Sequence, residues 1–237
     1  MKRTNPGSEP LIEWRATPPR ALPPTAGLHL WRIRTDARGA DLAEAAGLLD
    51  APQRARAEHL RHAPMRERYI RAQSGLRRVL GHYFGIDPRL IRFTHGPAGK
   101  PDLPPELGVC SFNLTTTGDL ALVAIGAGRG PDAELGVDCE HIRPRVDVFG
   151  VAARMFTPEV ESAIRTAPEP ERLLAFYRAW TALEADAKSN GRGLFKPRPS
   201  GARPPQVRHC IPADGYLAAV ARAQLPDPEQ WHSYDLT

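Results

Sequence analysis

The sequence of 237 residues predicts an α+β protein made of two halves, each with one long helix against a few antiparallel strands. Two stretches, Pro64–Phe84 and Glu171–Ser189, carry apolar residues at steps of three and four, which is the pattern of an amphipathic helix. Shorter apolar or alternating runs between them are typical of strands. The connector GAGRGP at 126–131 separates the two groups of elements and indicates a boundary there.

The first half is expected over residues 28–128, after an irregular Pro-rich arm at 1–27. Asp50 is predicted to cap a short helix that runs to about His62, and Gly85 to close the long helix. Four strands are predicted here, the last two joined by a turn at Thr117–Asp119: His29–Thr35, Ile91–Thr94, Val109–Leu114 and Leu120–Ile125.

The second half is expected over residues 129–237. Thr157 and Pro158 have the residue types of a helix cap and first helical position, and Asn190-Gly191 is predicted to end the long helix. A Pro/Arg/Gly loop is expected at 196–206. Three strands are predicted: Glu134–Glu140, Val207–Ile211 and Tyr216–Ala221.

Composition favours a soluble globular protein of the cytoplasm. Hydrophobic residues make up 41% and charged residues 25%, and no apolar run approaches the ~20 residues that span a bilayer. The three cysteines are widely spaced and odd in number, so reduced thiols are expected. The net charge of +5 suits an anionic partner, which leaves nucleic acid, a phosphorylated cofactor and an acidic protein open.

Asp138 and Glu140 form the first candidate site. They lie two positions apart at the end of the apolar run Leu135-Gly136-Val137, so a strand places both carboxylates on one face, about 6.5–7 Å apart. Two such charges repel each other, and a cation between them would relieve the repulsion. The alternative is a strand end that emerges into water with two solvated acids.

The second long helix carries the other candidate pair. Glu184 is expected at the edge of an apolar stripe, and Lys188 lies one turn further on. The pair is either an ordinary helix ion pair or a metal ligand beside a proton acceptor or phosphate contact. The predicted stripe consists of Leu173, Tyr177, Trp180, Leu183 and Ala187.

Together these residues resemble the signature of the 4′-phosphopantetheinyl transferase superfamily, of the Sfp-like kind. GVD-x-E at 136–140 is followed by W-x-x-x-E-A-x-x-K at 180–188, so that Glu184 lies 44 residues after Glu140. The resemblance covers about residues 30–225. Four further segments keep the family's order: Phe93 with Gly99-Lys100-Pro101, FNLTTTG at 112–118, RMFT at 154–157 followed by Glu161, and GRGL at 191–194.

The resemblance implies a pseudodimer of two similar α+β halves with coenzyme A in the cleft between them. It implies transfer of 4′-phosphopantetheine to a serine hydroxyl of an apo acyl or peptidyl carrier protein, with release of 3′,5′-ADP. The family's Mg²⁺ ligands fall on Asp138, Glu140 and Glu184, and either Glu184 or Lys188 would receive the serine proton. A Lys near Mg²⁺ and arginines is expected to have a depressed pKa.

The resemblance also assigns contacts to coenzyme A. Lys100 and Arg68 match basic contacts to the 3′-phosphate and pyrophosphate, with Arg54 or Arg56 as weaker candidates. Backbone amides of a turn at Thr115–Thr117 are expected to cradle phosphate oxygens. The full set of expected cofactor contacts is Arg68, Lys100, Pro101, Thr115, Thr116, Thr117, Asp138 and Lys188. We expect a monomer of bacterial origin that serves fatty acid, polyketide or nonribosomal peptide biosynthesis, without nucleic acid or membrane partners.

Two positions depart from the family pattern. Leu183 stands where the family usually has Lys, and Thr116 stands where it usually has His. We expect the chemistry to survive with weaker or altered cofactor binding. The alternatives are a specialised or catalytically degenerate relative and a non-catalytic basic binding protein.

Other chemistries lack their motifs. The glycines at 126–130 are not followed by Gly-Lys-Ser/Thr, so they form no P-loop, and the histidines show no HExxH spacing. No serine lies in GxSxG. The arginines of 54–78 are expected on the solvent side of helices without interleaved aromatics, which disfavours a nucleic-acid interface.

Overall fold

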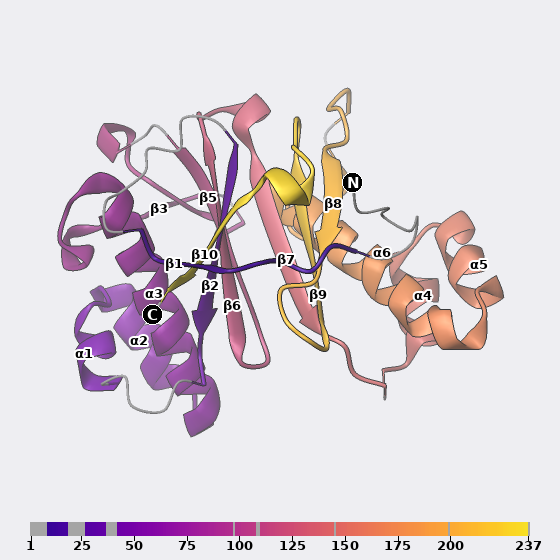
Figure 1. Ribbon diagram of the computed structural model, residues 1–237, viewed down its shortest axis with the longest axis horizontal. Coiled ribbons are helices and arrows are strands. Elements are labelled where there is room, and N and C mark those ends of the chain that lie inside the picture. The colour runs from indigo at the N-terminus through magenta and orange to yellow at the C-terminus, as the bar shows by residue number, and fades with distance from the viewer. Residues whose placement is uncertain are drawn as a thin grey trace.

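The chain folds into two β-sheets that face each other, with helices covering the outer face of each (Figure 1). The structure is a computed structural model that describes residues 9–18, 27–36, 42–96, 98–107, 110–144, 146–198 and 200–236. The predicted α+β class is confirmed. The parts of the predicted arm and of the strand at Val109 that fall outside these ranges lie outside the described residues.

The first sheet has five strands in the order β1 (Arg15–Ala16), β10 (His232–Leu236), β2 (Leu28–Arg34), β6 (Leu120–Ala127) and β5 (Cys110–Thr117). The second has three in the order β7 (Leu135–His141), β9 (Tyr216–Arg222) and β8 (Gln206–Cys210). A separate short pair is formed by β3 (Thr94–His95) and β4 (Pro101–Asp102). Strands β2, β6 and β5 are antiparallel, as are β7, β9 and β8, whereas β1, β10 and β2 run parallel.

The helices fall into two groups, one outside each sheet (Figure 1). The first group is α1 (Leu42–Gly47), α2 (Ala51–His59) and α3 (Ala63–Phe84), and the second is α4 (Val148–Met155), α5 (Pro158–Thr166) and α6 (Glu169–Ser189). The predicted caps are confirmed: Asp50 forms a capping box with Gln53, and Gly85 ends α3 with φ 64°. Within the described residues, no helix is long and apolar enough to cross a membrane.

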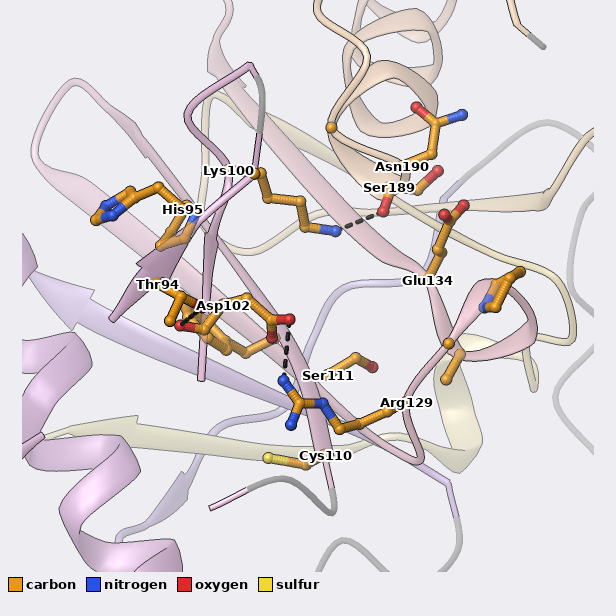
Figure 2. A pocket seen from close by; sticks show the side chains of 17 residues that line it. Thr94, His95, Lys100, Asp102, Cys110, Ser111, Arg129, Glu134, Ser189 and Asn190 are labelled. Carbon is orange, nitrogen blue, oxygen red and sulfur yellow. Dashed lines mark hydrogen bonds and ion pairs between the residues drawn. The ribbon is translucent and has the colours of Figure 1, made fainter. Parts of the chain in front are cut away.

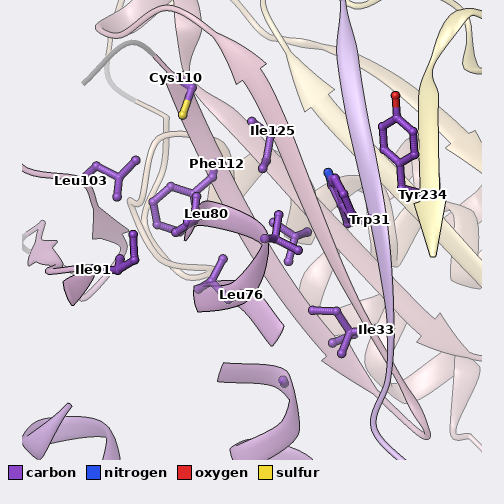
Figure 3. Packing of buried hydrophobic residues seen from close by; sticks show 14 residues of the cluster. Trp31, Ile33, Leu76, Leu80, Ile91, Leu103, Cys110, Phe112, Ile125 and Tyr234 are labelled. Carbon is purple, nitrogen blue, oxygen red and sulfur yellow. The ribbon is translucent and has the colours of Figure 1, made fainter. Parts of the chain in front are cut away.

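Strand alternation builds the two main cores. Leu28 and Leu30 of β2 point toward the second sheet, where they pack with Val137 and Val220. Trp31 and Ile33, on the opposite face of the same strand, pack with Leu76 and Leu80 of α3 (Figure 3). Because side chains alternate along a strand, one apolar strand serves both layers.

The strand predicted at Ile91–Thr94 is wrong except for Thr94, which begins β3. The reason is the guanidinium of Arg77, whose residue is 0% exposed. It donates to the backbone oxygens of Ile91 at 2.9 Å and Pro88 at 3.2 Å, and it also pairs with the Asp50 carboxylate. A buried charge needs such partners. The backbone oxygens of this segment therefore accept hydrogen bonds from Arg77 and not from a neighbouring strand.

Three strands, β1, β4 and β10, were not predicted, and β1 and β10 join distant parts of the chain. Strand β10 pairs with β2, so the C-terminal residues complete the first sheet. Segment 9–18 of the predicted arm crosses both sheets (Figure 1). Its Ile12 amide donates to Ile211 O at 3.0 Å, its Trp14 indole donates to Pro212 O at 2.8 Å, and Arg15 pairs with Tyr234.

A buried histidine in the first core gives the fold a pH dependence. His29 is 3% exposed, its Nδ1 lies 2.5 Å from the Tyr83 hydroxyl, and its ring contacts His232. Burial, with a smaller contribution from His232, lowers the pKa of His29 to about 4. In the unfolded chain the pKa returns to about 6.5, so the unfolded state binds the proton first as pH falls.

We therefore expect the free energy of unfolding to fall by up to about 3 kcal/mol between pH 6.5 and pH 4 because of His29 alone. Chemical denaturation at a series of pH values in the parent and in His29→Gln measures this. The variant should lack that part of the pH dependence. Parallel curves for the two proteins would show that His29 is not the titrating group.

Candidate active site

The candidate site lies where α6 rests on β7, beside the end of β5. Gly136, Asp138 and Glu140 lie on the face of β7 toward α6, so the predicted sharing of one face is confirmed. A Cβ on Gly136 would lie 1.9 Å from Ala185 O and 2.6 Å from Ser189 N. The missing side chain therefore lets α6 lie directly on β7, which brings Glu184 and Lys188 to Asp138.

The predicted apolar stripe of α6 is partly wrong. Tyr177 and Ala187 are buried, but Leu173, Trp180 and Leu183 are only partly buried, and the fully enclosed positions are Thr181 and Ala185. Small side chains face the sheet because the helix lies so close to β7 and β9. Leu173 and Trp180 instead join the cluster around Ala152 of α4 and Ile164 of α5.

Lys188 bridges two carboxylates. Its Nζ lies 2.5 Å from Asp138 Oδ1 and 3.1 Å from Glu184 Oε2, and it donates to Thr115 Oγ1 at 3.3 Å. Burial alone would lower the pKa of Lys188, but Asp138 and Glu184 outweigh it and raise the pKa above the ordinary value. The depressed pKa that was expected for Lys188 is not what its surroundings produce, since carboxylates surround the ammonium.

Glu140 is held from both sides. Trp180 Nε1 donates to its Oε1 at 3.2 Å, and Thr117 Oγ1 donates to its Oε2 at 3.3 Å. Burial, followed by the charge of Asp138, raises the pKa of both Glu140 and Glu184. Asp138, Glu140 and Glu184 thus influence one another, and we call these three the acidic cluster.

The acidic cluster fits a divalent cation in chemistry. Asp138 is 2% exposed, and its Oδ2 has no hydrogen-bond partner among the described residues. Carboxylate oxygens are the ligands that Mg²⁺ prefers. A bound cation would lower the raised pKa values of Glu140 and Glu184, because it favours their charged form. As the side chains lie, no three His, Cys, Asp or Glu residues in the described ranges are grouped closely enough to hold a metal, and Lys188 pairs with both Asp138 and Glu184.

The predicted turn at Thr115–Thr117 is wrong, since all three residues belong to β5 and the turn consists of Gly118 and Asp119. Their side chains alternate as strand residues do. Thr115 and Thr117 donate to Asp138 and Glu140, whereas Thr116 is exposed. The threonines are thus joined to the acidic cluster through hydroxyl groups, and their contact with phosphate stays a prediction.

Lys100 of the Gly-Lys-Pro segment points toward the end of α6 (Figure 2). Its Nζ donates to Leu135 O at 3.0 Å and to Ser189 O. Burial lowers the pKa of Lys100 to about 8. The side chain therefore ties the segment that precedes β4 to both β7 and α6, and its predicted phosphate contact is not tested by this arrangement.

One cavity connects the Gly-Lys-Pro segment with the catalytic candidates. Its volume is about 320 Å³, and its lining includes Lys100, Pro101, Glu184 and Lys188. Asn113, Leu114 and Leu194 complete much of the wall and were not among the predicted site residues. The Asn113 side chain accepts a hydrogen bond from Val137 N at 2.9 Å and so holds β5 to β7; the motif FNLTTTG contained this signal.

The remaining cationic candidates lie away from this cavity. Arg68 is exposed on α3 and pairs with Asp119 Oδ1 at 2.7 Å, next to the β5–β6 turn. Arg54 donates to Leu49 O at 2.5 Å, and Arg56 is exposed on α2. Leu183 is half-buried on α6 and does not line the cavity.

Comparison with known proteins identifies relatives of the chain. A family model described as the 4′-phosphopantetheinyl transferase superfamily matches residues 134–234. The 4′-phosphopantetheinyl transferase HetI of Nostoc sp. is 31% identical over 236 residues, which cover 92% of this chain and 98% of HetI. AcpT of Escherichia coli K12 is 32% identical over 140 residues, 59% of this chain and 65% of AcpT. Sfp of Bacillus subtilis is 27% identical over 122 residues, 52% of this chain and 51% of Sfp.

Proposed function

Because the chain belongs to the 4′-phosphopantetheinyl transferase superfamily and is a 4′-phosphopantetheinyl transferase, we propose that the acidic cluster and Lys188 form its active site. The observation that carries the proposal is the cavity shared by Lys100, Glu184 and Lys188, which reaches the residues that contact Asp138. In this proposal the cleft between the two halves holds coenzyme A, and the halves, related as a pseudodimer, meet near residue 128.

The reaction joins a serine of an apo acyl or peptidyl carrier protein to phosphopantetheine. The serine Oγ forms a bond to the phosphorus that carries the pantetheine arm. The bond from this phosphorus to the bridging oxygen breaks, and 3′,5′-ADP leaves with the electron pair. The serine proton passes to a protein base.

The chain's own residues divide this work. Mg²⁺ bound by Asp138, Glu140 and Glu184 would neutralise charge on the pyrophosphate. Thr115 and Thr117 orient the Asp138 and Glu140 carboxylates through hydrogen bonds. Trp180 fixes the second oxygen of Glu140.

Two groups compete for the role of base. Glu184 has a raised pKa through burial and Asp138, which makes it a better proton acceptor than an ordinary glutamate. The raised pKa of Lys188 keeps its ammonium protonated, so Lys188 acts as a base only after losing its proton, and otherwise it contacts phosphate. Both residues line the cavity. In this proposal the enzyme is a cytoplasmic monomer, whichever of the two is the base.

Binding of coenzyme A tests the acidic cluster directly. We expect coenzyme A with Mg²⁺ to raise the melting temperature more than either alone, since a ligand at about 100 times its Kd adds about 2.7 kcal/mol. Glu184→Gln should lose the Mg²⁺-dependent part. Glu159→Gln, an exposed change on α5, should keep it. Equal Mg²⁺-dependent shifts in both variants would remove Glu184 from the metal site.

The departures at Leu183 and Thr116 give a second prediction. If these positions weaken phosphate binding, the double variant Leu183→Lys with Thr116→His should tighten coenzyme A binding by about 1–3 kcal/mol and lower KM more than it raises kcat. Leu183 is half-buried, so unfolding is measured beside affinity. A stable double variant that binds no better would favour a remodelled cleft in a specialised relative.

A further inference from the structure

The loop between α6 and β8 exposes an aromatic side chain. Phe195 is 82% exposed, more than the other large apolar residues that the described ranges expose, such as Leu11 at 62% and Leu90 at 60%. Exposed aromatic side chains are enriched at sites of protein recognition. A phenyl ring that is exposed to this degree is therefore a candidate contact.

Phe195 directly follows residues that line the cavity at the proposed active site. The two residues before it, Gly193 and Leu194, line the same cavity as Glu184 and Lys188. A protein that delivers a serine to Lys188 must approach this cavity. Its surface around the serine would then meet the residues at the rim.

The loop holds Phe195 in a defined position. Arg192 pairs with Asp186 Oδ2 at 2.6 Å, and its other nitrogens donate to Asp186 O at 2.8 Å and Lys196 O at 3.1 Å. Arg198 also pairs with the Asp186 carboxylate. Asp186 of α6 thus fixes both sides of the loop around Phe195, so docking onto it costs little ordering.

The loop also carries a positive charge. Residues 191–206 contain four cationic side chains and no Asp or Glu. Arg192 and Arg198 share Asp186, whereas Lys196 and Arg203 are exposed. Opposite charges across an interface steer the encounter and fix its register, so this loop suits an acidic surface.

We propose that Phe195, together with Lys196 and Arg203, is the docking surface for an acidic carrier protein, which presents its acceptor serine to the neighbouring cavity. The inference rests on the proposed function and names the contact that its protein substrate makes. Phe195 supplies the apolar anchor, and the two cations pair with acidic residues beside the serine.

Direct binding tests the docking surface without requiring transfer. The probe is an acidic bacterial acyl carrier protein whose acceptor serine is replaced by alanine, titrated into the parent, Phe195→Ser and Leu90→Ser. Phe195→Ser should raise the Kd at least tenfold, whereas Leu90→Ser, which also removes an exposed apolar side chain but lies outside the loop, should leave it unchanged. Lys196→Glu should weaken binding and reduce its salt dependence. The thermal shift with coenzyme A should stay as in the parent for each variant.

Three results would overturn the inference: carrier binding by Phe195→Ser equal to that of the parent, absence of carrier binding by the parent, or a matching loss of coenzyme A binding in Phe195→Ser. The last would make Phe195 a cofactor contact. Transfer to the unmodified carrier is measured in parallel. If the parent transfers and Phe195→Ser binds the carrier normally, the proposed function stands and the docking surface is wrong. If the parent binds the carrier through Phe195 but does not transfer, the docking surface stands and the proposed function is wrong.

Discussion

Replacing Asp138 with asparagine should abolish phosphopantetheine transfer while the protein stays folded. Asparagine keeps the shape of the side chain but removes the charge that faces Lys188, and Asp138 Oδ2 is a buried oxygen without a hydrogen-bond partner among the described residues. A metal site that loses one of its carboxylates loses most of its function, so we expect the rate to fall about a thousandfold or more. The rate is measured with labelled coenzyme A at saturating Mg²⁺.

The control for this variant is Asp132→Asn, which removes an exposed carboxylate that does not line the cavity of Glu184 and Lys188. It should transfer at the parent's rate. Asp138→Asn should lower the free energy of unfolding by only about 1–3 kcal/mol, because Glu184 still pairs with Lys188. A folded Asp138→Asn that transfers at the parent's rate would remove Asp138 from the active site.

Gly136→Ala should cost both stability and activity. The new methyl group would lie 1.9 Å from the backbone oxygen of Ala185, and no side-chain movement relieves a clash with backbone. We expect a loss of about 3 kcal/mol or more in the free energy of unfolding, at the upper end for overpacked sites. Transfer should fall as well, because α6 carries Glu184 and Lys188 and must shift away from β7.

Gly47→Ala is the matched control, since a Cβ there meets nothing within 4 Å. On the helix α1 this change should be neutral or stabilising by up to about 1 kcal/mol. Denaturation curves and transfer rates of both variants are compared. Equal stabilities would show that α6 does not need its close approach at Gly136.

Local periodicity explains what the sequence predicts well. The common face of Asp138 and Glu140 follows from strand alternation, the start of α2 follows from Asp50, and the end of α3 follows from Gly85. These features depend on neighbours in the chain. The family resemblance, now confirmed by the comparisons, rests on several such local motifs in order.

Features that depend on distant contacts were missed. Strand β10 is five residues long and is defined by its pairing with β2, some 200 residues earlier in the chain. The buried face of α6 is set by the approach to Gly136, which favours Thr181 and Ala185 over larger side chains. The carbonyl oxygens of Pro88 and Ile91 turn to Arg77 because that guanidinium is buried, and spacing along the chain does not show this.

We propose that the acidic cluster with Lys188 carries out phosphopantetheine transfer. The most direct test is the intact mass of an apo acyl carrier protein after incubation with coenzyme A, Mg²⁺ and either the parent or Glu184→Gln. We expect the parent to add the mass of one phosphopantetheine group in a reaction that a chelator stops, and folded Glu184→Gln to add none at the same time point. An unchanged carrier with the parent, or full modification by Glu184→Gln, would contradict it.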